Sequence, residues 1–177
     1  MTSAVGIDLS LTATGVASSH GWCELVGQDG ILKLPILDRW RALANLRTKI
    51  IYAVGRPGLV CIEAPALSRS RGGTFERGWL WYAVVGSLIN LDIPVVEVGI
   101  GQLKRYATGN GSANKGGVLV AVTKRWPAFD TKGDDNLADA AVLAAIGAEL
   151  LGSPLAPMPA AQRTVLDGLR IPEGINR

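Results

Sequence analysis

Histidine and cysteine are scarce in this sequence. Its 177 residues include one histidine, His20, and two cysteines, Cys23 and Cys61. The cysteines form no Cys-x-x-Cys pair, so no zinc site is expected. We predict that both are reduced packing residues, and a lone disulfide is the alternative. The scarcity of histidine removes the usual general base of serine and cysteine nucleophiles. Acid–base chemistry must therefore rest on carboxylates, lysine or metal-bound water.

Long apolar runs are also missing. Although 48% of the residues are hydrophobic, no uninterrupted run approaches the roughly 20 residues that span a bilayer, so no membrane association is expected. The first apolar stretch has no basic residues before it and reaches an acid, Asp8, almost at once, unlike a secretory signal. We therefore expect a cytoplasmic protein.

The net charge of +3 is small, but its distribution is uneven. Between residues 66 and 125 there are eight basic and three acidic side chains, a net charge of +5, which leaves −2 for the rest of the chain. A basic middle third suits a polyanionic substrate such as a phosphodiester backbone. On charge alone, a solvated surface is an equally good interpretation.

The length suits one domain, and the apolar periodicity indicates an α/β fold. We predict strands over 4–9, 15–18 and 59–63, near 30–34 and over 93–98, and helices over 38–54, 74–91, 101–106, 115–126 and 135–151. The first three strands in chain order form an antiparallel meander, and a crossover helix makes the last two parallel. The expected domain, residues 1–152, is thus a mixed five-stranded sheet flanked by helices. Residues 153–177 form a proline-rich C-terminal tail, with a possible short helix over 160–169.

Acidic residues stand at the ends of apolar segments. Asp8 and Glu63 each end a predicted strand, and Asp135 and Asp139 lie four apart at the start of a predicted helix, where they share one face. Clustered carboxylates require cations, and Mg²⁺ and Mn²⁺ prefer carboxylate oxygen. The sequence therefore predicts a hard-metal site made of these four side chains.

Asp134 is the alternative to Asp135. The helical angle to Asp139 is about 40° for Asp135 and about 140° for Asp134, which favours Asp135. Both Asp134 and Asp135 also occupy positions typical of a helix N-cap, which has no catalytic purpose. Asp139 lies between two alanines in an apolar helix and would be costly to bury unpaired, which favours a metal.

The other two acids also have structural alternatives. Asp8 could brace a turn with Ser10, and Glu63 could pair with Arg69 or Arg71. In that case neither carboxylate would be available to a metal ion. The placement of both acids directly after apolar segments favours the metal site.

Four motifs in one order carry a family resemblance. They are GIDLSLTATG at 6–15, CIEAP at 61–65, KRYATGNGSANK at 104–115 and the helical acid pair at 135 and 139. With these motifs the chain resembles the RuvC family of Holliday junction resolvases, and phage-encoded members most closely. That family belongs to the ribonuclease-H-like superfamily, and the resemblance covers about residues 4–151.

The resemblance implies a function as well as a fold. It implies a divalent-metal-dependent endonuclease that resolves Holliday junctions as a symmetric homodimer, acting in the host cytoplasm if phage-encoded. Two Mg²⁺ or Mn²⁺ ions would assist phosphodiester hydrolysis, leaving 5′-phosphate and 3′-hydroxyl ends. We expect Asp8 to be the ligand shared by both ions, because its central strand is the most rigid support. Glu63 would bind on one side, and Asp135 with Asp139 on the other.

Basic residues are expected to contact the DNA. Lys115, at a helix N-terminus after a glycine-rich loop, is expected to bind the scissile phosphate or its developing charge. Exposed helix ends are the alternative for the lysines, and plain solvation for the arginines. The predicted DNA-binding side chains are Arg69, Arg71, Arg77, Lys104 and Lys115.

Aromatic residues cluster in the predicted helix 74–91. Phe75, Trp79 and Tyr82 are candidates for the aromatic wedge that the family places shortly after its glutamate. Core or dimer packing is the alternative for Trp79, Trp81 and Tyr82. We expect this helix to form the dimer contact.

Three other functions remain open at this point. A nuclease of the same fold could prefer DNA flaps or forks to four-way junctions. The Gly-Ile-Asp stretch followed by Ser, Thr and Gly also resembles the first phosphate loop of actin-like ATPases and sugar kinases, although those proteins need two such domains. The third alternative is a non-catalytic protein that binds branched nucleic acid, which the complete acid set disfavours.

Overall fold

A five-stranded mixed sheet forms the centre of the protein, in a computed structural model that describes residues 2–65 and 72–175. The strand order is β3-β2-β1-β4-β5. An antiparallel meander is formed by β1 (Ala4–Asp8), β2 (Thr14–Ser18) and β3 (Trp22–Val26). Parallel to β1 lie β4 (Leu59–Glu63) and β5 (Val95–Val98). The predicted α/β fold with a mixed five-stranded sheet is confirmed.

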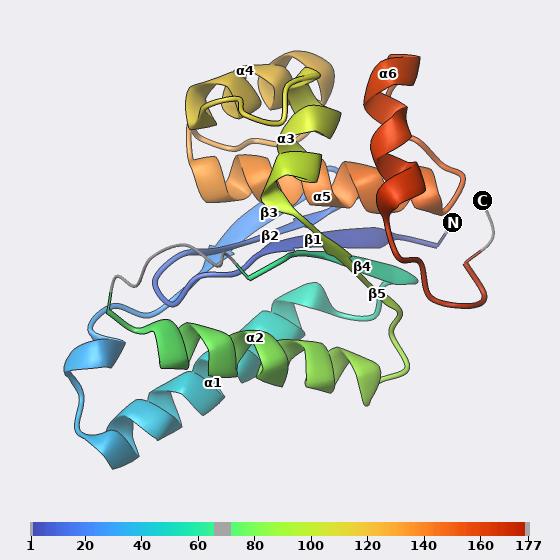
Figure 1. Ribbon diagram of the computed structural model, residues 1–177. Coiled ribbons are helices and arrows are strands. Elements are labelled where there is room, and N and C mark those ends of the chain that lie inside the picture. The colour runs from blue at the N-terminus through green and yellow to red at the C-terminus, as the bar shows by residue number, and fades with distance from the viewer. Residues whose placement is uncertain (1, 66–71, 176–177) are drawn as a thin grey trace.

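Helices cover both faces of the sheet (Figure 1). One face carries α1 (Ile36–Val54) and α2 (Thr74–Ile89). The other carries α3 (Ile100–Thr108), α4 (Lys115–Arg125), α5 (Asp135–Leu150) and α6 (Ala160–Arg163). The five long helices begin and end within two residues of the predicted bounds. In the part of the chain that is described, no helix combines the length and hydropathy needed to cross a lipid bilayer.

The two faces of the sheet carry side chains of different size. Because side chains alternate along a strand, the branched residues Val5, Ile7 and Val16 point to the layer of α1 and α2 and are buried there. On the opposite face of β1 and β2 the same alternation places glycine and alanine, including Gly6 and Gly15. Helix α5 packs against this small-residue face.

The contact between α5 and the sheet is backbone to backbone. A Cβ added to Gly6 would lie 2.1 Å from the carbonyl oxygen of Ala140, and one added to Gly15 would lie 2.1 Å from that of Asn136. Neither distance leaves room for a methyl group. The absence of side chains at these two positions therefore sets how closely α5 approaches β1 and β2.

The strand predicted near 30–34 is wrong. Residues Ile31–Lys33 form a short 3-10 helix, η1, and the third strand is β3 instead. Ser18 and Trp22 pair across a three-residue hairpin loop that contains Gly21 at φ +89°, and a glycine with positive φ is typical of such a loop. The sequence signal for the hairpin is the single glycine of its loop. The more prominent apolar residues at 31–34 belong to the segment that leads into α1.

The C-terminal residues pack against α3 and α5. Helix α6 continues into a second 3-10 helix, η2 (Thr164–Gly168), and Val165, Leu166 and Leu169 are buried in the core on this side of the sheet. The Tyr106 hydroxyl donates a 2.5 Å hydrogen bond to the buried Glu149 carboxylate. Arg163 of α6 pairs with the same carboxylate. One buried acid thus joins α3, α5 and α6.

Both cysteines are free, as predicted. Cys61 is fully buried in the core of the α5 side, and Cys23 is partly exposed on β3. Burial raises the pKa of the Cys61 thiol to about 12. This thiol is therefore a packing residue rather than a reactive one.

The close approach of α5 predicts a large effect of one methyl group. Gly15→Ala should lower the free energy of unfolding by at least about 3 kcal/mol, because the added carbon overlaps the α5 backbone. Urea denaturation measures this loss. Gly78→Ala is the matched control, since a Cβ there meets no atom within 4 Å and should stabilise α2 by up to about 1 kcal/mol. Equal stability of Gly15→Ala and wild type would show that the contact is not as tight as described.

Candidate active site

Two carboxylates meet at the C-terminal ends of β1 and β4 because these strands are parallel neighbours. Asp8 is the last residue of β1, and Glu63 is the last residue of β4. In the register of this pair, Ile7 lies opposite Ile62. Asp8 and Glu63 are the next residues of the two strands, so they lie side by side.

Helix α5 brings the third carboxylate. Its first turn lies on Gly15, and Gly15 pairs with Asp8 across β1 and β2. Asp139 follows Asn136 by about one helical turn and therefore returns toward the same point above the sheet. One carboxylate oxygen from each of Asp8, Glu63 and Asp139 lies within 4.8 Å of the others. Three of the four predicted metal ligands thus converge.

The three carboxyl groups are partly buried and repel one another. Burial raises the pKa of Asp8 to about 6 and that of Asp139 to about 7. The pKa of Glu63 rises to about 8, first through burial and then through the charges of Asp8 and Asp139. Without a cation, the group cannot be fully ionised at neutral pH. The donor set contains only carboxylate oxygens, so it fits a hard divalent ion such as Mg²⁺ or Mn²⁺.

Asp135 lies outside this group of three. Its carboxylate forms a 3.2 Å ion pair with the Lys115 ammonium at the start of α4, and the two side chains are 36% and 69% exposed. This ion pair raises the pKa of Lys115. The Lys115 charge partly offsets the rise in the pKa of Asp8 and of Asp139. The pair therefore places a cation beside the carboxylates.

Asp134 acts as the N-cap of α5. Its Oδ1 accepts hydrogen bonds from the backbone nitrogens of Asn136, at 2.9 Å, and Leu137, at 3.0 Å. Its charge contributes to the raised pKa of Asp8. The cap fixes the start of α5, and hence the place of Asp139, without supplying a third oxygen from this helix.

Backbone contacts hold the two strand ends that carry the acids. The Trp81 indole nitrogen of α2 donates a 2.9 Å hydrogen bond to the Glu63 carbonyl oxygen. After β1, the Thr14 hydroxyl donates to the Ser10 carbonyl oxygen at 2.5 Å and accepts from the Ser10 nitrogen at 3.0 Å. Sequence reasoning placed Trp81 among core or dimer residues and missed this role, because no local pattern links it to Glu63.

The predicted DNA-binding residues lie at different places. Lys104 of α3 is close enough to lower the pKa of both Glu63 and Asp139. Arg77, in the first turns of α2, donates a 3.0 Å hydrogen bond to the Gly72 carbonyl oxygen. Arg69 and Arg71 fall outside the described residues. Lys104 and Lys115 are thus the basic side chains that the structure places beside the carboxylates.

The aromatic candidates lie on the exposed side of α2. Phe75 is 91% exposed and Tyr82 is 73% exposed, whereas Trp79 is 39% exposed. Phe75 lies in the first turn of α2, the point of this helix nearest in sequence to Glu63. These three side chains are available to a partner, and Trp81 is turned toward β4 instead.

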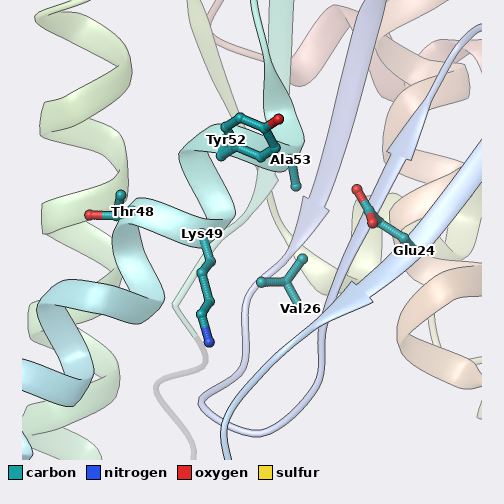
Figure 2. Close-up of a pocket in the computed structure, with 6 residues that line it drawn as sticks. All are labelled: Glu24, Val26, Thr48, Lys49, Tyr52 and Ala53. Carbon is teal, nitrogen blue, oxygen red and sulfur yellow. The ribbon is translucent and has the colours of Figure 1, made fainter.

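A pocket of about 540 Å³ lies elsewhere, between β3 and α1 (Figure 2). It is lined by Glu24, Val26, Thr48, Lys49, Tyr52 and Ala53. Figure 2 shows Glu24 and Val26 on the strand side and the other four on the helix. None of these residues belongs to the carboxylate group, so this pocket is not part of the candidate active site.

Comparison with known proteins finds a relative in sequence. No family model matches the chain. The crossover junction endodeoxyribonuclease RuvC of Alkalilimnicola ehrlichii is 28% identical over 116 residues, which cover 63% of this chain and 70% of the relative.

Two solved structures have the same fold. RuvC of Thermus thermophilus in complex with a Holliday junction substrate superimposes with a TM-score of 0.63 at 21% identity, covering 86% of this chain and 98% of that one. A structure of Thermus thermophilus RuvC gives a TM-score of 0.60, also at 21% identity, over 85% and 97% of the two chains. The chain therefore has the ribonuclease-H-like fold of RuvC and is similar in sequence to a RuvC crossover junction endodeoxyribonuclease.

Proposed function

We propose that this protein is a divalent-metal-dependent endonuclease that cleaves branched DNA, with the Holliday junction as its substrate. The observation that carries the proposal is the convergence of Asp8, Glu63 and Asp139 at one edge of the sheet. The similarity to RuvC in sequence and fold supports it. Strand cleavage would leave 5′-phosphate and 3′-hydroxyl ends.

The carboxylates would hold two Mg²⁺ or Mn²⁺ ions. Asp8, on the central strand, is the proposed shared ligand, with Glu63 on one side and Asp139 on the other. Asp135 completes the proposed set on the Asp139 side, next to its ion pair with Lys115. When bound, such ions lower the pKa of an attacking water and neutralise the leaving oxygen.

The basic side chains would hold the scissile strand. Lys115 and Lys104 flank the carboxylates from α4 and α3, as their effects on the acid pKa values indicate. We assign Lys115 to the scissile phosphate and Lys104 to an adjoining phosphate of the same strand. Arg77, with Arg69 and Arg71, is proposed to contact the DNA backbone. These contacts position the strand and carry no sequence information.

A second copy of the chain is the proposed partner of α2. Phe75, Trp79, Tyr82 and Ile89 recur at helical spacing and form one exposed apolar stripe. Gly86 lies in the same repeat, where an added Cβ would meet no other atom, so another helix can approach closely. Two-fold pairing of this stripe gives a dimer whose two sites are related by symmetry. Such a dimer can nick two strands of a four-way junction.

Loss of one carboxylate should abolish cleavage and spare binding. Purified protein should cut a synthetic four-way junction in Mg²⁺ or Mn²⁺ but not in EDTA. Asp8→Asn should lower the single-turnover rate by at least about 1000-fold, because metal stabilisation of the transition state is worth several kcal/mol. Gel-shift affinity for the junction in Ca²⁺ should stay unchanged.

The matched control for this substitution is Asp92→Asn. Asp92 lies in an exposed turn before β5, at the end of the parallel strands opposite to the carboxylates. It should cut at the wild-type rate. Flap, fork and linear duplex substrates, tested in parallel, measure the preference among branched forms. Failure of the wild-type protein to cut any of these DNAs with either metal would refute the proposed activity.

The raised pKa values predict that the metal-free protein loses stability as pH rises. The folded pKa values of about 6, 7 and 8 for Asp8, Asp139 and Glu63 exceed those of unfolded carboxyl groups. The folded state therefore holds more protons than the unfolded state between about pH 4 and 8, and its stability falls across that range. Raising the pH from 6 to 8.5 in EDTA should lower Tm by at least about 4 °C.

Two comparisons isolate the cause. Glu63→Gln should reduce this loss, and saturating Mg²⁺ should reduce it in the wild type, because both relieve the repulsion among carboxylates. Glu24→Gln, at an exposed position of β3, should leave the pH dependence as it is in the wild type. A Tm that rises between pH 6 and 8.5 in EDTA would contradict the shifted pKa values.

A charge within the α2 stripe should break the proposed dimer. Tyr82→Glu places a carboxylate in an apolar contact between helices and should yield a monomer by light scattering at micromolar concentration. It should also prevent the paired nicks that resolve a junction. Tyr52→Glu makes the same change at an exposed site on α1 and should leave the dimer intact. A wild-type protein that is monomeric both free and on the junction would overturn the assignment of α2.

A further inference from the structure

A polar cavity lies beside α3. Its volume is about 570 Å³, and its walls come from the first turns of α3, the glycine-rich loop before α4, and the 3-10 helix η2 near the C-terminus. The 3-10 helix η2, which is distant in the sequence, therefore meets α3 and the loop that follows α3. The predicted site residues include none of those that line it.

Arg105 supplies the charge of this cavity. It is the one charged residue among those that line the described cavity. Arg105 is exposed, and across residues 2–65 and 72–175 its guanidinium donates no hydrogen bond and forms no ion pair. Ser112 and Thr164 also line the cavity. One uncommitted guanidinium among neutral polar groups suits an anion that has several oxygens, such as a phosphate.

Glycines keep the guanidinium uncovered. Gly101 and Arg105 are four residues apart and share one face of α3. Gly111 of the opposite loop approaches this face, so that a Cβ added to it would lie 3.1 Å from the Gly101 carbonyl oxygen and 3.7 Å from Arg105 Nη2. Because no side chain stands at either glycine, a ligand can reach the guanidinium and the nearby backbone.

The cavity lies next to the carboxylates along the same edge of the sheet. Helix α3 begins directly after β5, whose last residue, Val98, is the register partner of Glu63. Lys104 and Arg105 are consecutive on α3, so their side chains diverge by about 100°. The Lys104 charge lowers the pKa of Glu63 and of Asp139, while Arg105 lines the cavity. A strand that crosses α3 would meet both cations.

We propose that this cavity binds a backbone phosphate of a DNA arm next to the cleavage site, with Arg105 as its principal donor. This inference rests on the proposed function and adds a contact that lies beyond the metal site. The C-terminal residues take part, since η2 supplies one wall. The Gln102 side chain donates to the Gly168 carbonyl oxygen at 3.4 Å, which links this wall to α3.

Removal of the guanidinium charge tests the proposal directly. Junction affinity is measured by fluorescence anisotropy in Ca²⁺ over a series of salt concentrations, using the full chain. Arg105→Gln should weaken binding about five-fold, the upper range for one exposed ion pair. It should also lower the slope of log K against log salt by about 1. The single-turnover cleavage rate at saturating protein should change less than about two-fold, because the arm contact is made in the ground state too.

Arg56→Gln is the matched control. Arg56 lies before β4, at the opposite end of the sheet, where its Nη1 donates to the Leu91 carbonyl oxygen at 3.4 Å. It makes the same change in net charge, so a general loss of positive charge would affect both variants equally. The proposal requires that Arg56→Gln bind with the wild-type affinity and salt slope.

Gly101→Asp provides a second variant that is expected to fold. An added Cβ there meets only the Gly111 carbonyl oxygen, at 3.9 Å, and an acid in the first turn of a helix is favourable. The new carboxylate would pair with Arg105 and repel phosphate. Junction binding should weaken at least as much as in Arg105→Gln, while Tm stays at or above the wild-type value.

The outcomes separate the two levels of inference. Wild-type cleavage with unchanged affinity in both Arg105→Gln and Gly101→Asp would overturn the phosphate subsite and leave the nuclease proposal standing. Equal weakening in Arg105→Gln and Arg56→Gln would also overturn it, because the effect would then be one of net charge. A wild-type protein that neither binds nor cuts the junction would overturn the proposed function, and the subsite with it.

Discussion

The contact between α5 and the first two strands is the constraint on which the candidate site depends. Gly6 and Gly15 present bare backbone to α5, and the carbonyl oxygens of Ala140 and Asn136 occupy the space that side chains would fill. A larger residue at either glycine would lift the helix. Asp139 would then move away from Asp8, and the three carboxylates would no longer share one ion-sized space. A packing feature of the core thus sets a distance in the site.

That convergence has an electrostatic cost for the folded protein. Asp8, Glu63 and Asp139 are partly buried with like charges as neighbours, which raises all three pKa values. Fold stability alone would disfavour such a group, and functional sites commonly show this conflict. Divalent ions would offset the repulsion, and the ion pair of Lys115 with Asp135 already brings one positive charge close. The arrangement of the three carboxylates therefore favours a bound cation.

Helix α3 connects the candidate site to the rest of the molecule. One of its residues, Lys104, lowers the pKa of Glu63, and the next, Arg105, lines the polar cavity. A third, Tyr106, is buried and bonds to Glu149, which also holds Arg163 of the C-terminal segment. Because the residues of one helix move together, the C-terminal segment helps to hold the Lys104 and Arg105 side chains in place. The C-terminal segment is thus linked to the proposed DNA contacts as well as to the core.

The sequence by itself determined the mixed sheet, the long helices and the positions of Asp8 and Glu63. Alternation, helical period and strand ends are local properties that can be followed along the chain, and the parallel pairing of two strands places their last residues together. The hairpin that defines β3 was missed because its signal is a single glycine loop, while a nearby apolar run was more prominent. The helical angle predicted that Asp135 shares a face of α5 with Asp139, but it could not give the distance from Asp135 to Lys115 on another helix.

Only the tertiary structure decided which acids lie within reach of one ion and what surrounds them. The pairing of Asp135 with Lys115, the hydrogen bond from Trp81 to the Glu63 carbonyl and the cavity at Arg105 all join residues that are distant in sequence. Such contacts depend on how helices and strands pack, to within a few tenths of an ångström. Local periodicity gives the direction of a side chain, whereas packing between elements gives its distance from a partner.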